Sequence, residues 1–220
     1  MGVFCLIPAR SGSKRIKNKN IKIFHGKPLI NYAISQAKKS GLFNKIFVST
    51  DSPRIAKIAE KCGATIPFLR PKNISNDKTT DDSVRNHFFK YFKDKIKIDY
   101  LCYLYACTPL LKANSLKKSF QLISQKKYGQ LTAISKYSSS IQRALEKNSK
   151  DEIVYKDPKF KRLRSQNLKE YYYDAGQFYW YNFNKNVKKR IIGYEISATE
   201  SIDINTLEDF NMASILYKKK

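Results

Sequence analysis

The spacing of apolar residues alternates between two periods along the first half of the chain. Residues 3–7 form a continuous apolar run, which is typical of a strand covered on both faces. Between Leu29 and Ala37 apolar residues recur every three or four positions, and Gly41 follows them. This spacing predicts a helix that ends at the glycine, since glycine tolerates the left-handed conformation of a helix end. A strand followed by such a helix is the first half of a βαβ unit.

The same alternation continues through the rest of the chain. Ser52 and Pro53 are expected to begin a helix that ends at Cys62, and Thr206 to cap a final helix with Asp209 in the capping-box position. Further helices are predicted at residues 82–92 and 114–125, and further strands at 45–48, 65–69, 100–105, 130–135, 177–181 and 190–196. The order predicts an α/β fold with a doubly wound, mainly parallel sheet. Ligands of such sheets bind beyond the carboxyl ends of the strands.

Residues 137–170 interrupt this order. The segment is rich in serine and charged residues and holds two short stretches of extended pattern, near residues 153–155 and 160–163. The chain has no internal repeat and no linker that would separate two independent domains. We therefore predict one domain over residues 1–220, with 137–170 as an inserted hairpin arm.

The charge of the chain narrows the classes of ligand. Lysine and arginine number 43 against 18 aspartates and glutamates, which gives a formal net charge of +25. The basic residues are spread over the whole chain, the longest lysine run is residues 218–220, and no motif repeats basic with aromatic residues. A nucleic-acid-binding face is therefore not predicted. The charge favours small anionic substrates, because it raises their concentration near the protein.

The cysteines and the apolar runs exclude other classes. Cys5, Cys62, Cys102 and Cys107 form no CxxC pair, and the chain has two histidines in total. Zinc and a disulfide framework are not expected. We expect reduced, mostly buried thiols instead. No apolar run approaches the roughly 20 residues of a membrane helix, and the N-terminus lacks the features of a signal peptide. We expect a cytoplasmic protein without a membrane partner.

A basic loop follows the first predicted strand. Arg10, Lys14 and Lys19 bring positive charge to it, and the small residues 11–13 allow backbone N–H groups to approach phosphate oxygens. The spacing matches neither a Walker A loop nor the GxGxxG motif. Composition alone allows a basic surface loop with a turn glycine, but the position after a buried strand favours phosphate binding.

Four blocks of sequence carry a resemblance to a known family. Residues 7–15 with Lys19 and Asn20, then 48–51, 68–71 and 201–204, resemble in order the motifs of the acylneuraminate cytidylyltransferases over nearly the whole chain. Two further stretches, residues 105–111 and 164–180, resemble the pseudaminic acid branch of that family. The family has a Rossmann-like fold of the nucleotide-diphospho-sugar transferase type, which agrees with the α/β pattern.

The resemblance implies an activity. CTP and an acidic nine-carbon sugar, pseudaminic acid, would give the CMP-sugar and pyrophosphate in the presence of Mg²⁺. Legionaminic or N-acetylneuraminic acid as the acceptor, or a CTP-binding member with impaired catalysis, are the alternatives. The family also uses an excursion like residues 137–170 to form a homodimer and to reach the partner's active site.

The same resemblance assigns roles to residues. Arg10, Lys14 and Lys19 would be catalytic, and the sugar would bind Arg164, Asp174 and Gln177. The CTP-binding residues would be Ala9, Arg10, Ser11, Gly12, Lys14, Asn20, Arg70, Asp77 and Thr79.

A metal site is expected near the C-terminus. Asp203 and Asn205 lie two apart in an extended segment, so both side chains leave the same face. The family typically has two aspartates there that bind Mg²⁺, whereas here the second residue is an asparagine. Glu200 is near in sequence and is a further candidate ligand. Asp51 ends a strand at the same edge, but it equally suits an ordinary helix N-terminus.

Overall fold

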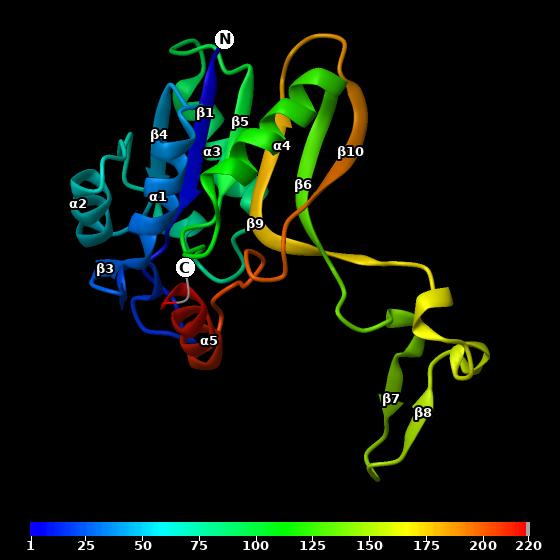
Figure 1. Ribbon diagram of the computed structural model, residues 1–220. Helices are drawn as coiled ribbons and strands as arrows, with labels where there is room; N and C mark the ends of the chain where they lie inside the picture. The colour runs from blue at the N-terminus through cyan, green and yellow to red at the C-terminus, as the bar shows by residue number, and fades with distance from the viewer. Residues whose placement is uncertain (219–220) are drawn as a thin grey trace.

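A six-stranded sheet forms the centre of the computed structural model, which describes residues 1–218 (Figure 1). The strands lie in the order β10-β6-β9-β5-β1-β4. They are β1 (Val3–Pro8), β4 (Lys45–Ser49), β5 (Tyr100–Leu104), β6 (Tyr128–Lys136), β9 (Tyr172–Asn182) and β10 (Lys188–Glu195). Strand β1 is parallel to β4 and β5, β10 is parallel to β6, and β9 runs antiparallel to both of its neighbours. The predicted mainly parallel sheet is confirmed.

Helices cover both faces of this sheet, which is why its strands are apolar on both sides. The helices are α1 (Leu29–Ser40), α2 (Pro53–Lys61), α3 (Asp81–Phe92), α4 (Ala113–Lys126) and α5 (Leu207–Lys218). Along β1, Val3, Cys5 and Ile7 belong to one apolar cluster, which includes residues of α1 and α4. Phe4 and Leu6 belong to a second cluster, with residues of α3. The alternation of side chains along a strand thus assigns β1 to two cores.

The predicted helix ends are also present. Gly41 closes α1 with a φ of 66°. The side chain of Ser52 accepts a hydrogen bond from the backbone N–H of Ile55 at the start of α2. Before α5, the N–H of Asp209 donates to the Thr206 hydroxyl at 3.2 Å, and the N–H of Thr206 donates to the Asp209 carboxylate at 2.7 Å. This reciprocal pair is the predicted capping box.

The strand predicted at residues 65–69 is wrong. The segment makes only isolated parallel bridges, from Thr65 to Phe47 and from Leu69 to Thr50. Pro67 stands between them and has no N–H to donate, so a continuous ladder beside β4 cannot form.

A small antiparallel ribbon was not predicted from the sequence. Strands β2 (Ile23–Phe24) and β3 (Lys27–Pro28) are joined by His25 and Gly26, both with positive φ. Two positive φ values are typical of the tight turn of a two-residue hairpin. The Phe24 ring makes edge contacts with Phe210 and Tyr217 of α5. The ribbon therefore holds α5 in place, and with it the segment that precedes α5.

The inserted arm projects from the body of the protein (Figure 1). It contains the hairpin of β7 (Leu145–Lys147) and β8 (Ile153–Tyr155), as well as short 3₁₀ helices at Ile141–Arg143, Pro158–Phe160 and Ser165–Asn167. Further 3₁₀ helices lie at Lys19–Ile21 and Lys72–Ile74. The extended pattern predicted at residues 160–163 is wrong, because Asp157 caps the turn that Pro158 begins. Leu145, Ile153 and Val154 of the hairpin are exposed.

Most of the cysteines are buried, as expected. All four cysteines are free, and Cys5, Cys102 and Cys107 are buried. Burial raises the pKa of the Cys107 thiol to about 12, so this thiol is unreactive at neutral pH. Within residues 1–218, no helix has the length and apolar character needed to cross a membrane.

Candidate active site

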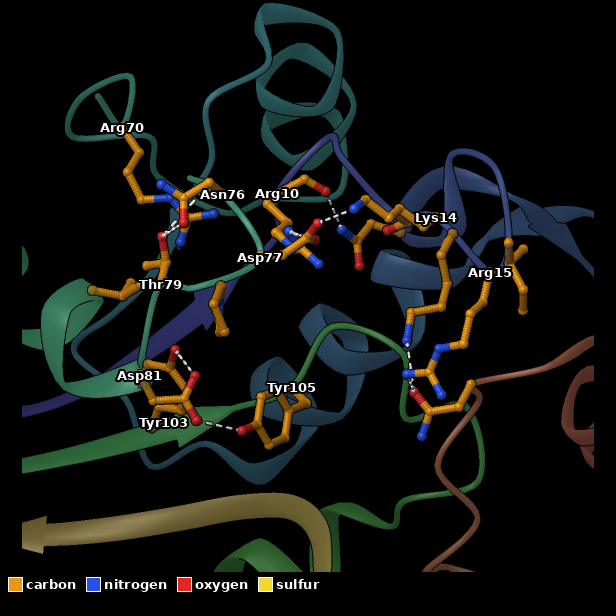
Figure 2. Close-up of a pocket in the computed structure, with 17 residues that line it drawn as sticks. Arg10, Lys14, Arg15, Arg70, Asn76, Asp77, Thr79, Asp81, Tyr103 and Tyr105 are labelled. Atoms are coloured by element: carbon orange, nitrogen blue, oxygen red, sulfur yellow. Dashed lines mark hydrogen bonds and ion pairs between the residues drawn. The ribbon is translucent and has the colours of Figure 1, made fainter. Parts of the chain in front are cut away.

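A cavity of about 260 Å³ lies at the carboxyl ends of β1 and β5 (Figure 2). Its walls come from the loop after β1, from the segment between Arg70 and Val84, from Tyr103 and Tyr105, and from Asn205. These pieces are far apart in sequence. They meet here because parallel strands end at one edge of the sheet, where ligands of this fold class bind.

Five cationic side chains line the cavity. Arg10, Lys14, Lys19 and Arg70 were predicted from the sequence, and Arg15 was not. Arg15 directly follows Lys14 in the same basic loop, which is a signal that sequence reasoning passed over. Arg70 is only 5% exposed, and burial lowers the pKa of its guanidinium. Such a concentration of positive charge is suited to a polyanionic ligand such as a triphosphate.

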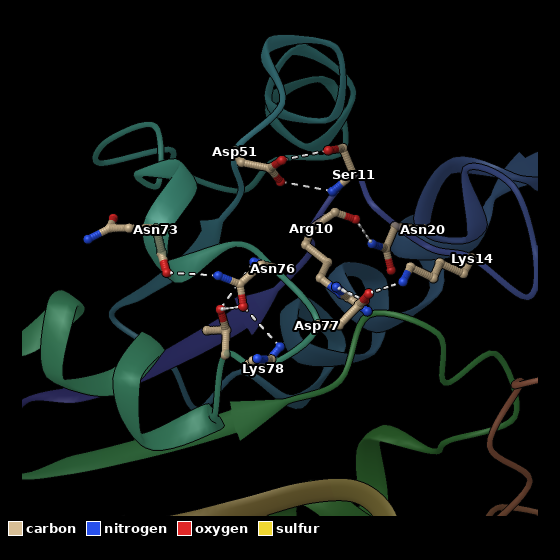
Figure 3. Close-up of polar contacts among 10 residues, drawn as sticks. Arg10, Ser11, Lys14, Asn20, Asp51, Asn73, Asn76, Asp77 and Lys78 are labelled. Carbon is tan, nitrogen blue, oxygen red and sulfur yellow. Dashed lines mark hydrogen bonds and ion pairs between the residues drawn. The ribbon is translucent and has the colours of Figure 1, made fainter.

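Asp77 lies between two of these cations. Its carboxylate accepts from Arg10 Nη1 at 2.6 Å and pairs with Lys14 Nζ at 2.5 Å (Figure 3). The hydrogen bonds from Lys14 and Arg10 lower the pKa of Asp77. Asp77 therefore acts as a counter-charge for the two cations, and a bound phosphate group would compete with it for them.

The loop after β1 is held by side chains from other elements. Asp51 accepts from the Ser11 N–H at 2.8 Å and from the Ser11 hydroxyl at 2.5 Å (Figure 3). The Asn20 amide donates to the Arg10 carbonyl at 2.8 Å and accepts from the Cys107 thiol at 3.3 Å. Asp51 and Asn20 thus fix the backbone that presents Arg10, and Asp51 is a structural support of the loop.

Three predicted CTP-binding residues do not line the cavity wall. Ala9 is buried and its N–H pairs with the Ser49 carbonyl at 2.9 Å. The Ser11 N–H and hydroxyl are used by Asp51, and Gly12 is exposed. The charged side chains of the loop thus line the cavity, whereas these three small residues do not.

The segment after Arg70 is braced by hydrogen bonds within itself. Arg70 Nε donates to the Ser75 hydroxyl at 3.1 Å. The Thr79 hydroxyl accepts from the Asn76 N–H at 3.1 Å, and the Asn76 side chain in turn accepts from the Lys78 N–H at 2.9 Å. Thr79 and Asn76 both line the cavity, as Figure 2 shows, so the segment forms a wall opposite the basic loop.

Asp203 and Asn205 lie side by side, as the two-residue spacing predicts. The Asn205 amide donates to Asp203 Oδ2 at 2.5 Å, and its oxygen accepts from Arg15 at 2.7 Å. Lys19 Nζ donates to the Ile204 carbonyl at 2.7 Å. No group of three or more His, Cys, Asp or Glu side chains suited to a metal occurs in residues 1–218. One carboxylate with a neutral amide fits a Mg²⁺ ion that arrives with nucleotide phosphates, since these ions often take one or two carboxylates and fill their shell with phosphate and water.

The carboxylate of Glu200 is engaged in hydrogen bonds at the start of α4. Its carboxylate accepts from the Lys112 N–H at 2.9 Å and from the Ser115 hydroxyl at 3.0 Å. These bonds place the charge of Glu200 at the N-terminus of α4, where the helix dipole favours a negative group.

The predicted sugar-binding residues Asp174 and Gln177 differ in their exposure to solvent. Asp174 is exposed on β9 and accepts from the Tyr179 hydroxyl at 2.8 Å. Gln177 is fully buried, its amide donates to the Ile202 carbonyl at 3.3 Å, and its oxygen has no hydrogen-bond partner within residues 1–218. Gly176, with a φ of 58°, would bring an added Cβ to 3.8 Å from Asp203 Oδ2. The start of β9 therefore lies directly against the segment that carries Asp203.

Arg164 lies in the arm, outside the cavity wall of its own chain. It is exposed and precedes the short helix Ser165–Asn167. Within one chain the structure does not bring it together with Asp174.

Asp81 and two tyrosines form a part of the cavity that the sequence did not reveal. Asp81 is the first residue of α3, and its carboxylate accepts from the hydroxyls of Tyr103 and Tyr105 (Figure 2). Burial, and then the charge of Asp81, raise the pKa of Tyr103 well above its usual value. The sequence places Tyr103 and Tyr105 two apart at the end of β5, on one face, but does not show what they contact.

The chain matches known proteins over nearly its whole length. The model of the cytidylyltransferase family matches residues 4–218. Two proteins named pseudaminic acid cytidylyltransferase, both from Campylobacter jejuni, are 37% and 38% identical over 221 residues, covering 97% of this chain and 95% of each relative. An N-acylneuraminate cytidylyltransferase of Streptococcus agalactiae is 28% identical, over 96% of this chain and 52% of its own length.

Solved structures share the fold. A CMP:2-keto-3-deoxy-manno-octonic acid synthetase complexed with CTP superimposes with a TM-score of 0.73 at 16% identity, over 100% of this chain and 99% of the other. A 4-diphosphocytidyl-2C-methyl-D-erythritol synthase from Anaerococcus prevotii gives a TM-score of 0.65 at 11% identity, over 99% and 98% of the two chains. At these identities the likeness confirms the Rossmann-like α/β architecture.

Proposed function

The chain belongs to the cytidylyltransferase family, and on that premise we propose that it transfers CMP from CTP to pseudaminic acid. The observation that carries the proposal is the set of cations from one loop, Arg10, Lys14, Arg15 and Lys19, which line a cavity at the carboxyl end of β1. The likeness to two pseudaminic acid cytidylyltransferases, over nearly the full length of the chain, supports this sugar as the acceptor. The CMP-sugar is the activated form that a glycosyltransferase consumes, and the proposed location of the reaction is the cytoplasm.

The reaction needs positioning and charge neutralisation more than covalent chemistry. The anomeric hydroxyl oxygen of the sugar attacks the α-phosphorus of CTP and loses its proton to solvent. The bond from that phosphorus to the bridging oxygen breaks, and pyrophosphate leaves with the electron pair. Arg10, Lys14 and Lys19 would bind the phosphates and stabilise the charge that grows on the leaving group.

Mg²⁺ is the proposed cofactor. Asp203 would hold it with one carboxylate oxygen, and the Asn205 oxygen, which accepts from Arg15 in the structure, would be a neutral second ligand. When bound, Mg²⁺ supplies positive charge to the phosphate oxygens. Arg15 and Lys19 contact the same short segment, so the protein brings two cations of its own to this place.

The acceptor carries a carboxylate and several hydroxyl and amide groups. Asp174 is exposed beside the segment of Asp203, where it would accept hydrogen bonds from sugar hydroxyls. Gln177 is buried behind it and would position that segment through the Ile202 carbonyl. An arginine grips a carboxylate with two parallel hydrogen bonds, and we assign this role to Arg164, brought to the site by a partner subunit.

We propose that the arm forms a homodimer. An isolated two-stranded hairpin is marginally stable in water, and this one exposes Leu145, Ile153 and Val154. A second copy of the chain would cover these side chains and bring Arg164 to the cavity of its neighbour. Light scattering should give twice the chain mass of 25.6 kDa, and replacing Ile153 and Val154 by serine should reduce it to the monomer mass. A monomer in the unaltered protein would contradict the dimer.

The activity is tested by incubating the purified protein with CTP, Mg²⁺ and a panel of acidic sugars. We expect pyrophosphate release with pseudaminic acid at a rate at least ~10-fold above legionaminic and N-acetylneuraminic acid, the range of discrimination that a few pocket contacts supply. A reaction without sugar is the control for CTP hydrolysis. Release with none of the sugars would contradict the proposal, and release with another member of the panel would correct the acceptor.

A further inference from the structure

The carboxylate of Asp81 lines the same cavity as five cationic side chains. It carries two hydrogen bonds, from the Tyr103 hydroxyl at 2.8 Å and from the Tyr105 hydroxyl to its other oxygen. Each tyrosine thus fixes one oxygen of the carboxylate. The side chain is held in one orientation and is not a mobile surface charge.

The two tyrosines remain donors at any pH at which the protein works. Burial raises the pKa of both hydroxyls, and the charge of Asp81 raises it further. Because both hydroxyl protons point at the carboxylate, Asp81 has only acceptor capacity to offer a ligand. A ligand group that meets Asp81 in the cavity must therefore be a hydrogen-bond donor.

Arg70 supplies the opposite chemistry at the same end of the cavity. Its Nε donates to Ser75, which leaves its two terminal nitrogens as the donors that it can offer to a ligand. Arg70 and Asp81 both line the cavity. Val84 and Pro8 add apolar surface to the cavity. This end of the cavity is thus suited to a flat ring that has both acceptors and a donor on one edge.

We propose that the Asp81 carboxylate accepts a hydrogen bond from the C4 amine of cytosine and so selects CTP over UTP. This inference rests on the proposed function. Cytosine presents two acceptors, O2 and N3, beside its amine, which match the donors of Arg70 and the acceptor of Asp81. Carboxylates are known partners of that amine. Uracil has a carbonyl oxygen at C4, which a carboxylate repels.

The test compares binding of CTP and UTP by titration calorimetry in the presence of Mg²⁺. The unaltered protein should bind CTP at least ~100-fold more tightly than UTP, because a site built for a donor rejects an analogue that lacks it. Asp81→Asn should reduce that ratio by about 10- to 100-fold, since the asparagine amide can donate to uracil O4. Asp82→Asn is the matched control: Asp82 is the next residue of α3, exposed and paired with Arg85, and the ratio should stay within about twofold.

Three further measurements test the role of Asp81 and the folding of the variants. Tyr105→Phe keeps the charge of Asp81 but releases one of its oxygens, and the ratio should fall by roughly 3- to 10-fold. The triphosphate of pyrimidin-2-one riboside lacks any group at C4. It should bind the unaltered protein about tenfold more weakly than CTP does, whereas the Asp81→Asn variant should bind this analogue and CTP equally tightly. Thermal unfolding of each variant confirms that it is folded.

The outcomes separate this inference from the function on which it rests. An unaltered protein that binds CTP selectively, with Asp81→Asn equally selective, overturns the role of Asp81 and leaves the proposed function intact. A protein that binds neither nucleotide overturns both. Equal losses for CTP and UTP in Asp81→Asn likewise contradict recognition of the amine.

Discussion

Replacing Lys19 by methionine should lower kcat/KM for CTP by about 100- to 1000-fold, the loss typical of removing one donor that stabilises a developing negative charge. Lys19 is half-buried, lines the cavity and donates to the Ile204 carbonyl beside Asn205. Together with Arg15, it therefore joins the basic loop to the expected metal segment. Pyrophosphate carries more charge as it leaves than CTP carries at the same oxygens. The loss should consequently appear mainly in kcat, with a smaller change in KM.

The matched control is Lys17→Met. Lys17 is exposed in the same loop, two residues away, and does not line the cavity. The control removes the same charge from the chain, so kcat/KM should change less than about threefold. Similar losses in the two variants would mean that only the overall charge matters, and would contradict a specific role for Lys19. Unfolding temperatures within a few degrees of each other exclude a trivial loss of structure.

Much of the fold follows from local patterns in the sequence. The continuous apolar run of β1 and the helical spacing of α1 are visible because burial on both faces leaves no room for polar residues. The box of Thr206 and Asp209 is equally local, since its partners are three residues apart. The failures have local causes too. Pro67 breaks a segment that is apolar enough for a strand, and the ribbon of β2 and β3 is too short to produce a period.

The charged residues of the site could be predicted from the sequence, but their hydrogen-bond partners could not. A basic loop after the first strand predicts a phosphate site, because its position in the fold is fixed by the strand before it. Which side chains face the ligand depends on residues far away in sequence. Asp51 accepts hydrogen bonds from Ser11, which lies 40 residues away in the sequence. Asn205 accepts from Arg15, which lies 190 residues away. Spacing along the chain carries no information about such pairs.

Asn205 illustrates how these connections change the meaning of a substitution. By sequence, an asparagine among expected aspartates removes a charge from a metal site. In the structure its oxygen accepts from Arg15, and its amide donates to Asp203. The asparagine therefore links a cation to the remaining carboxylate, which keeps Arg15 beside the place where phosphates and Mg²⁺ are expected. This place in the structure therefore combines one carboxylate with a protein cation.

Substitutions at Asp203 and Asn205 should change the affinity for Mg²⁺ in opposite directions. Asp203→Asn removes the one carboxylate of the pair, and kcat/KM at a fixed Mg²⁺ concentration should fall by about 100-fold or more. Asn205→Asp adds a second carboxylate, and the Mg²⁺ concentration for half-maximal rate should fall by about tenfold. Binding of Mn²⁺ in the presence of CTP, followed by electron paramagnetic resonance, gives the same order of affinities without turnover.

Arg15 determines how much Asn205→Asp raises the affinity for the metal. The new carboxylate of Asn205→Asp would pair with Arg15 and so lose part of its strength as a metal ligand. Combining Asn205→Asp with Arg15→Gln removes this competition, and metal affinity should rise further, by roughly threefold. Arg190→Gln, an equal loss of charge on exposed β10, is the matched control and should leave metal affinity unchanged. An Asn205→Asp variant whose Mn²⁺ affinity equals that of the unaltered protein would show that position 205 does not face the metal. In that case Arg15 would be held there for the phosphates alone.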